Sequence, residues 1–327
     1  MNCIDRRYFE SLKENPNAIW KYLDCIEKIA YHQFQDSPLI MEEVFCDDVN
    51  ICLYESPSDV SLTRNTIKPK NYYFDWTVVK SPGNPLEYVK KLINEGIIVG
   101  INTYFYDIPN FTWYQNERYR ESVHFCMVIG YDENGFWLKD VPGLMKVEYL
   151  NDRNFTIISY EEMARYLSKQ CNIFIFREKN DTFFIRENLD ELIRKMIQEY
   201  SAPLCVENEI MVWKGKNAYE RLLLLIKNED PRLLEMDFYH GDFASYIISG
   251  RHDILRRNIL KKYGDNRLTQ DVLKMLKVCQ NEWEVLGNKI LKENMKKGIC
   301  VPTEGDIYNI YKLEHKLVEY LKFLVEC

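Results

Sequence analysis

Two spacings of apolar residues alternate along the first half of the chain. Residues 17–34 carry apolar side chains every three or four positions, which predicts a helix. The same spacing predicts two more helices, at 85–94 and 161–168. Short apolar runs bounded by polar turns predict strands at 51–54, 72–79, 97–104, 145–149, 155–159 and 172–177. The first half is therefore expected to mix helix and strand.

The pattern changes after the polar stretch at 178–181. Helical spacing then dominates, and it predicts helices at 189–200, 222–226, 254–263, 272–291 and 307–324. A length of 327 residues is enough for two domains. The sequence thus predicts an α+β protein with one domain over residues 1–180 and a helical domain over residues 181–327.

The segment 124–140 predicts a β-hairpin that brings a histidine near a carboxylate. His124 begins one apolar run and Asp140 ends the next, and the midpoint falls in the turn signal Asp132-Glu133-Asn134-Gly135. The even separation of the two ends favours one face of the sheet. A carboxylate that accepts one imidazole N–H holds the other nitrogen toward a third group. Each residue also has a simpler explanation, His124 as a core histidine and Asp140 as a turn residue.

Cys25 is the candidate third group. Asp24 as N-cap and Glu27 three residues later form a capping box, which places the thiol at the first helical position, where the helix dipole stabilises a thiolate. The two carboxylates oppose this by raising the thiol pKa, so a protonated histidine is needed. His32 lies roughly 10 Å further along the same helix, beyond hydrogen-bonding reach. His124, on the predicted hairpin, is therefore the candidate base. The alternative is a small buried hydrophobe, as most free cysteines are.

The order of these motifs resembles a known family. The pattern His–apolar run–Gly-Tyr-Asp-x-x-Gly–strand–Asp over 124–140 looks like the second half of the papain-like fold in bacteriocin-processing peptidases and butirosin-type acyltransferases. Cys25 with its helix, followed by Asp36-Ser37-Pro38-Leu39, is similar to how the acyltransferases begin. The segment around Trp283 looks like their helical partner domain.

The resemblance implies a papain-like cysteine protease fold with an additional C-terminal α-helical domain. It implies a Cys25–His124–Asp140 triad that moves an acyl group from a carrier-protein thioester to an amine, through an acyl-cysteine. The implied partners are an acyl or peptidyl carrier protein, which is phosphopantetheinylated, and a small-molecule amine acceptor. No separate cofactor is implied.

The family pattern is incomplete at the oxyanion hole. Papain-like enzymes usually carry a glutamine a few residues before the cysteine, and Asn17 is the weak substitute here. Loss of one such donor costs about 2.7–4 kcal/mol of transition-state stabilisation, which an activated thioester tolerates better than a peptide. Acyl transfer is therefore favoured. A cysteine peptidase or amidohydrolase with the same triad stays open, as does a catalytically inactive carrier-protein-binding module.

Five further residues are candidates for substrate binding. Tyr104, Tyr106 and Trp113 lie in an aromatic segment just before the histidine strand and would line an acyl-chain site, although a self-packed loop explains them equally well. His240 and Asp242 interrupt the helical half, where they would face the cleft.

Composition excludes several classes of partner. A net charge of −7 argues against nucleic acid and anionic membranes as partners. No apolar stretch approaches the roughly 20 residues that cross a bilayer, and the charged start of the chain predicts a cytoplasmic protein. Ten scattered cysteines without a C-x-x-C pair predict reduced thiols, and five histidines without metal-ligand spacing predict no metal site.

Overall fold

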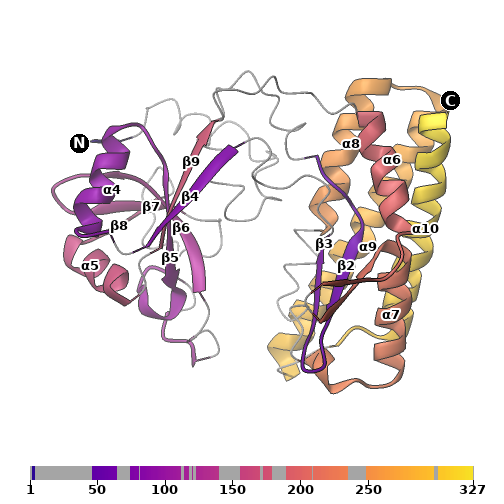
Figure 1. Ribbon diagram of the computed structural model, residues 1–327, viewed down its shortest axis with the longest axis horizontal. Coiled ribbons are helices and arrows are strands. Elements are labelled where there is room, and N and C mark those ends of the chain that lie inside the picture. Colours follow the sequence, from indigo (N-terminus) through magenta and orange to yellow (C-terminus); the bar gives the residue numbers. More distant parts are fainter. Residues whose placement is uncertain are drawn as a thin grey trace. The chain divides into compact units, whose positions relative to one another are not determined.

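The computed structural model of the chain (Figure 1) contains two compact units. They are Met1–Pro38 with Lys70–Phe183, and Leu39–Pro69 with Phe184–Cys327. Within them the structure describes residues 2–3, 46–64, 74–80, 82–111, 114–117, 120, 123–139, 155–169, 172–178, 189–207, 209–234, 248–297 and 301–326. These residues form a mixed α+β protein with antiparallel sheets, so this part of the sequence prediction is confirmed.

The first unit contains a single antiparallel sheet among its described residues. Its strands run in the order β4 (Phe74–Lys80), β9 (Asn172–Glu178), β5 (Val99–Tyr104), β6 (Val123–Tyr131), β7 (Phe136–Lys139) and β8 (Thr156–Ile158). The short strand β1 (Asn2–Cys3) also pairs with β6. Strand β6 therefore lies inside the sheet, with β5 on one side and β7 on the other.

Helices α4 (Pro85–Asn94) and α5 (Tyr160–Lys169) pack on one face of this sheet. The side-chain oxygen of Asn84 accepts the N–H of Glu87, and Pro85 opens α4, which are two common signals of a helix start. The core between helices and sheet combines side chains from both layers, namely Val89, Leu92, Ile93, Val99, Ile101, Cys126, Val128, Leu138, Met163, Leu167, Ile173 and Ile175. Burial of the apolar side chains of α4 and α5 in this core holds the two helices on the sheet.

The turn between β6 and β7 lies where the sequence predicted it, at 132–135. Asp132 accepts the N–H of Asn134 through its side chain, and its own N–H donates to the carbonyl of Gly135. Gly135 has a φ of +152°, and a Cβ added there would lie 2.0 Å from the carbonyl oxygen of Ile158. Only glycine fits this position without movement of the neighbouring strand.

The second unit contains a smaller sheet and several helices. Its strands run antiparallel in the order β10 (Cys205–Glu207), β11 (Ile210–Lys214), β2 (Ile51–Glu55) and β3 (Val60–Arg64). The sequence assigned 51–64 to the N-terminal domain, but β2 pairs with β11, about 160 residues later in the chain. The division into units consequently differs from the expected 1–180 and 181–327, because strand pairing between distant segments leaves no local signal.

The helices of the second unit are α6 (Leu189–Tyr200), α7 (Gly215–Lys227), α8 (Ser249–Tyr263), α9 (Arg267–Lys297) and α10 (Glu304–Glu326). Each contains or matches a helix that the apolar spacing predicted. Their core joins the inner face of the sheet, with Ile51, Leu53, Val60, Leu62, Ala218, Leu222, Trp283, Ile290 and Ile310 among its members. Within the described residues, no helix combines the length and the apolar character needed to cross a membrane.

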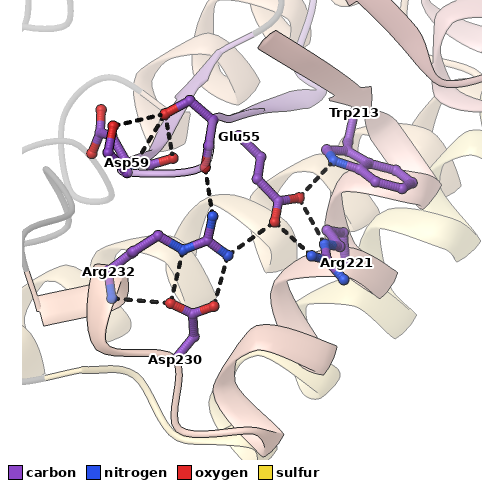
Figure 2. A network of polar contacts seen from close by, with 8 residues as sticks. Glu55, Asp59, Trp213, Arg221, Asp230 and Arg232 are labelled. Carbon is purple, nitrogen blue, oxygen red and sulfur yellow. Dashed lines mark hydrogen bonds and ion pairs between the residues drawn. The ribbon is translucent and has the colours of Figure 1, made fainter. Parts of the chain in front are cut away.

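A buried carboxylate ties the sheet of the second unit to α7 and to the turn after it (Figure 2). Glu55, at the end of β2, accepts hydrogen bonds from Trp213 (Nε1, 3.1 Å) and from Arg221 (Nε, 2.8 Å; Nη2, 2.5 Å). Arg232, in the short 3₁₀ helix η5 (Pro231–Leu234), reaches Glu55 at 3.0 Å and Asp230 at 2.7 Å. We call these five residues the Glu55 network.

Candidate active site

The candidate base lies on the strand inside the sheet of the first unit. His124 is the second residue of β6, and its backbone is in register with Thr103 of β5. The β6–β7 hairpin pairs Tyr131 with Phe136 and ends at the pair of Met127 and Lys139, with a register shift between 128 and 130. Lys139 directly precedes Asp140 in the chain, so Asp140 lies within one residue of this pair. Met127, the β6 member of the pair, lies three positions along the strand from His124.

Six of the predicted site residues lie outside the described residues, namely Cys25, Asp140, Asn17, Trp113, His240 and Asp242. For His124 the structure describes the strand and its register. The Cys25–His124–Asp140 triad therefore stays a prediction.

Two of the predicted aromatic residues are described, and they differ in surroundings. Tyr104 ends β5, opposite Val123, and is half-buried. Tyr106 lies in the 3₁₀ helix η2 (Phe105–Asp107), and its hydroxyl donates to Glu117 at 2.8 Å while the guanidinium of Arg120 lies 5.1 Å from its ring centre. The hydroxyl of Tyr106 is thus already engaged by an exposed ion pair, which leaves Tyr104 as the better candidate for an acyl-chain contact.

Lys139, at the end of β7 and directly before Asp140 in the chain, is a buried lysine that the sequence analysis did not identify. Lys139 is 5% exposed, and none of the described residues forms an ion pair with it. Burial lowers its pKa from the usual 10.5 to about 8, because desolvation disfavours the charged form. The alternation of side chains along β7 could have predicted this burial, because Lys139 lies on the same face of the strand as the buried Trp137.

The face of the sheet away from α4 and α5 is also apolar and buried. Met127, Trp137, Phe155 and Phe174 are all under 7% exposed, and the rings of Trp137 and Phe155 stack at 4.8 Å. Strand alternation places two polar groups on it, Lys139 and Asn102, a residue of β5 that is in register with Phe125 of β6. The side-chain oxygen of Asn102 is buried and has no hydrogen-bond partner among the described residues.

Replacing the buried ammonium should stabilise the first unit. At pH 7, Lys139→Met is expected to raise the free energy of unfolding by about 1–3 kcal/mol, because the charged form pays a desolvation cost in the folded state only. Between about pH 8 and 10.5 the unfolded chain binds more protons at this site, so the stability of the parent protein should rise with pH while the variant's should not. Pulsed hydrogen exchange of peptides from 123–139 across urea series at pH 7 and 9 measures both effects.

Lys80→Met, on the exposed end of β4, is the matched control and should leave both quantities unchanged. Equal stability of Lys139→Met and the parent at pH 7 would show that the ammonium is not desolvated.

Comparison of the sequence with protein-family models and with curated proteins finds no match. The chemistry of the site consequently follows from its own residues and from the arrangement of the strands that carry them.

Proposed function

We propose that the chain is a cysteine-dependent acyltransferase whose first unit has a papain-like fold. Cys25 is the nucleophile, His124 the base and Asp140 the group that orients the imidazole. The observation that carries the proposal is the β6–β7 hairpin, since it puts the backbone of His124 on an inner strand and returns the chain to within one residue of Asp140. A base and its orienting carboxylate need neighbouring, rigid supports of this kind.

The proposed reaction has two exchanges at one carbonyl carbon. The Cys25 thiolate adds to the carbonyl of a carrier-bound thioester, a C–S bond forms, and the carrier sulfur leaves and takes a proton from the imidazolium of His124. The amine of the acceptor then adds to the acyl-cysteine and gives a proton to His124. The C–S bond to Cys25 breaks, leaving an amide and the free enzyme, with no net oxidation or reduction.

Thioester chemistry suits a site without an obvious side-chain donor at the oxyanion hole. Exchange of one thioester for another is nearly isoenergetic, and the acyl carbon is already activated. The backbone N–H of Cys25 is available as an oxyanion donor in any conformation that exposes the start of its helix. The proposed substrates are a carrier-bound thioester and a small amine.

Trapping the acyl-enzyme tests the proposal. Incubation with an acyl-phosphopantetheinyl carrier protein, without amine, should add one acyl group to the protein by intact mass and map it to Cys25. Cys25→Ala should give no adduct, while Cys205→Ser, at an exposed cysteine of the second unit, should react like the parent. Adding amines should then release an amide.

Two results would contradict the proposal. An adduct that maps to another cysteine would reject Cys25 as the nucleophile. Release of the acid alone, with no amide from any of a broad set of amines, would replace acyl transfer by hydrolysis.

A further inference from the structure

Three side chains with metal-binding atoms meet inside the second unit. His252 lies on α8, Cys279 on α9 and Glu314 on α10, and all three are at most 3% exposed. One nitrogen, sulfur or oxygen atom of each lies within 4.8 Å of those of the other two. Three helices therefore direct an imidazole, a thiol and a carboxylate to one buried point.

The imidazole of His252 has the orientation of a metal ligand. Its Nδ1 lies 2.9 Å from the carbonyl oxygen of Ile248 and donates its N–H to it, which directs Nε2 toward the cluster. An oxygen of Glu314 lies 2.8 Å from Nε2, but the contact lacks the geometry of a hydrogen bond. Histidines that bind metals usually donate their other N–H to a carbonyl or carboxylate in this way.

Two further groups complete the surroundings. The indole N–H of Trp283 donates to Glu314 at 2.8 Å, which holds the carboxylate in place as an outer-shell donor does in metal sites. The hydroxyl of Tyr219 is fully buried and has no hydrogen-bond partner in the described part of the chain. The ring centre of Tyr219 lies 6.5 Å from that of Trp283.

We propose that His252, Cys279 and Glu314 bind one Zn²⁺ ion. Zinc favours this mixture of nitrogen, sulfur and oxygen donors in a tetrahedron, whose ligand atoms are about 3.3–3.8 Å apart. Small shifts of the three side chains would bring their ligand atoms from within 4.8 Å of one another to these distances. The bound ion neutralises the carboxylate and the thiolate, and the thiol proton passes to solvent.

The position of the site indicates a structural role. All three ligand side chains are buried, which is typical of zinc ions that support a fold. Here the ion would join α8, α9 and α10. The sequence predicted no metal site because the ligands come from three separate helices, so no short spacing between them exists to be recognised.

Metal loading of the full chain tests the site. The chelator-treated protein, given zinc and then desalted, is expected to retain one equivalent per chain and to unfold at a higher temperature than the metal-free form. X-ray absorption of the zinc-loaded parent should show one sulfur at about 2.3 Å in a shell of nitrogen and oxygen. This spectrum needs no variant, so it decides the ligand set even if substitutions in the core prevent folding.

Cobalt(II) loading identifies the sulfur. The thiolate-to-cobalt absorption should appear in the parent and in Cys205→Ser, and it should be lost in Cys279→Ser. Glu314→Gln, which preserves shape and removes charge, should weaken zinc binding about 10–100-fold. Cys25→Ala should bind zinc like the parent, which separates this site from the acyl chemistry. Loss of zinc on desalting, a shell without sulfur, or an unchanged cobalt spectrum in Cys279→Ser would overturn the proposal.

Discussion

His124→Ala is expected to slow the acylation of Cys25 by about two to four orders of magnitude at pH 7, which is the usual contribution of a positioned general base. Without the imidazole, Cys25 must ionise next to Asp24 and Glu27, whose charges raise the thiol pKa. The rate of adduct formation from an acyl-thioester, followed by intact mass with rapid quenching, measures the effect.

The dependence on pH distinguishes a lost base from a damaged fold. A cysteine without a base ionises only at or above the ordinary thiol pKa of about 8.5, so the deficit of His124→Ala should shrink as the pH rises from 7 to 9.5. His32→Ala is the matched control, since that histidine lies too far along the predicted helix, and it should react like the parent. A deficit in His124→Ala that is equal at all pH values would point to misfolding, and a normal rate would remove His124 from the mechanism.

Glu55→Ala is expected to destabilise the second unit by about 3 kcal/mol, within the range for breaking a buried ion pair by removal of one partner. Glu55 is 2% exposed on its side chain, whereas Arg221 and Arg232, which cover it, are 25% and 20% exposed. The variant leaves the Arg221 guanidinium and the Trp213 N–H without their acceptor (Figure 2). Urea unfolding followed by hydrogen exchange in peptides from 209–227 measures the loss.

The Glu55 network should also make stability depend on pH. The hydrogen bond from Arg221 is the largest cause that holds the pKa of Glu55 below its usual 4.5, with burial opposing it. The stabilisation is therefore complete above pH 4.5 and is lost as the pH falls through the lower folded-state pKa. The parent should lose more stability than Glu55→Ala over that acidic range.

Glu87→Ala provides the comparison for Glu55→Ala. Glu87 pairs with Lys90 at 2.9 Å on the surface of α4 and is 64% exposed, so its removal should cost at most about 1 kcal/mol. If Glu55→Ala cost no more than this surface substitution, the Glu55 network would carry no special stability.

Much of the local structure could be predicted from the sequence because it follows from local periodicity. The apolar stripe at 85–94 gives α4 with the same bounds, and the apolar run at 97–104 contains β5. The β10–β11 hairpin was missed. Its strands are short, and its residues include Val206 at 64% and Ile210 at 38% exposed, so neither strand shows a clear buried face.

The candidate sites show the same limit. The turn signal at 132–135 was enough to pair the strand of His124 with the run that ends before Asp140, because a hairpin is a local structure. Packing between distant segments determines two other features of the structure. These are the burial of Lys139 and the cluster of His252, Cys279 and Glu314. Contacts of that kind join residues far apart in the chain, and no pattern within a window of the sequence records them.

The origin of β2 and β3 in the segment 39–69 has a consequence for synthesis on the ribosome. Leu53 emerges about 160 residues before Trp213, the partner it pairs with across β2 and β11. At about 5–20 residues per second, the hairpin of β2 and β3 waits on the order of ten seconds for the rest of its sheet. During that time its apolar residues Ile51, Leu53 and Val60 lack their final covering. A nascent chain stalled before residue 205 should therefore bind chaperones through this hairpin, and a fragment that begins at residue 184 should lack half of its sheet.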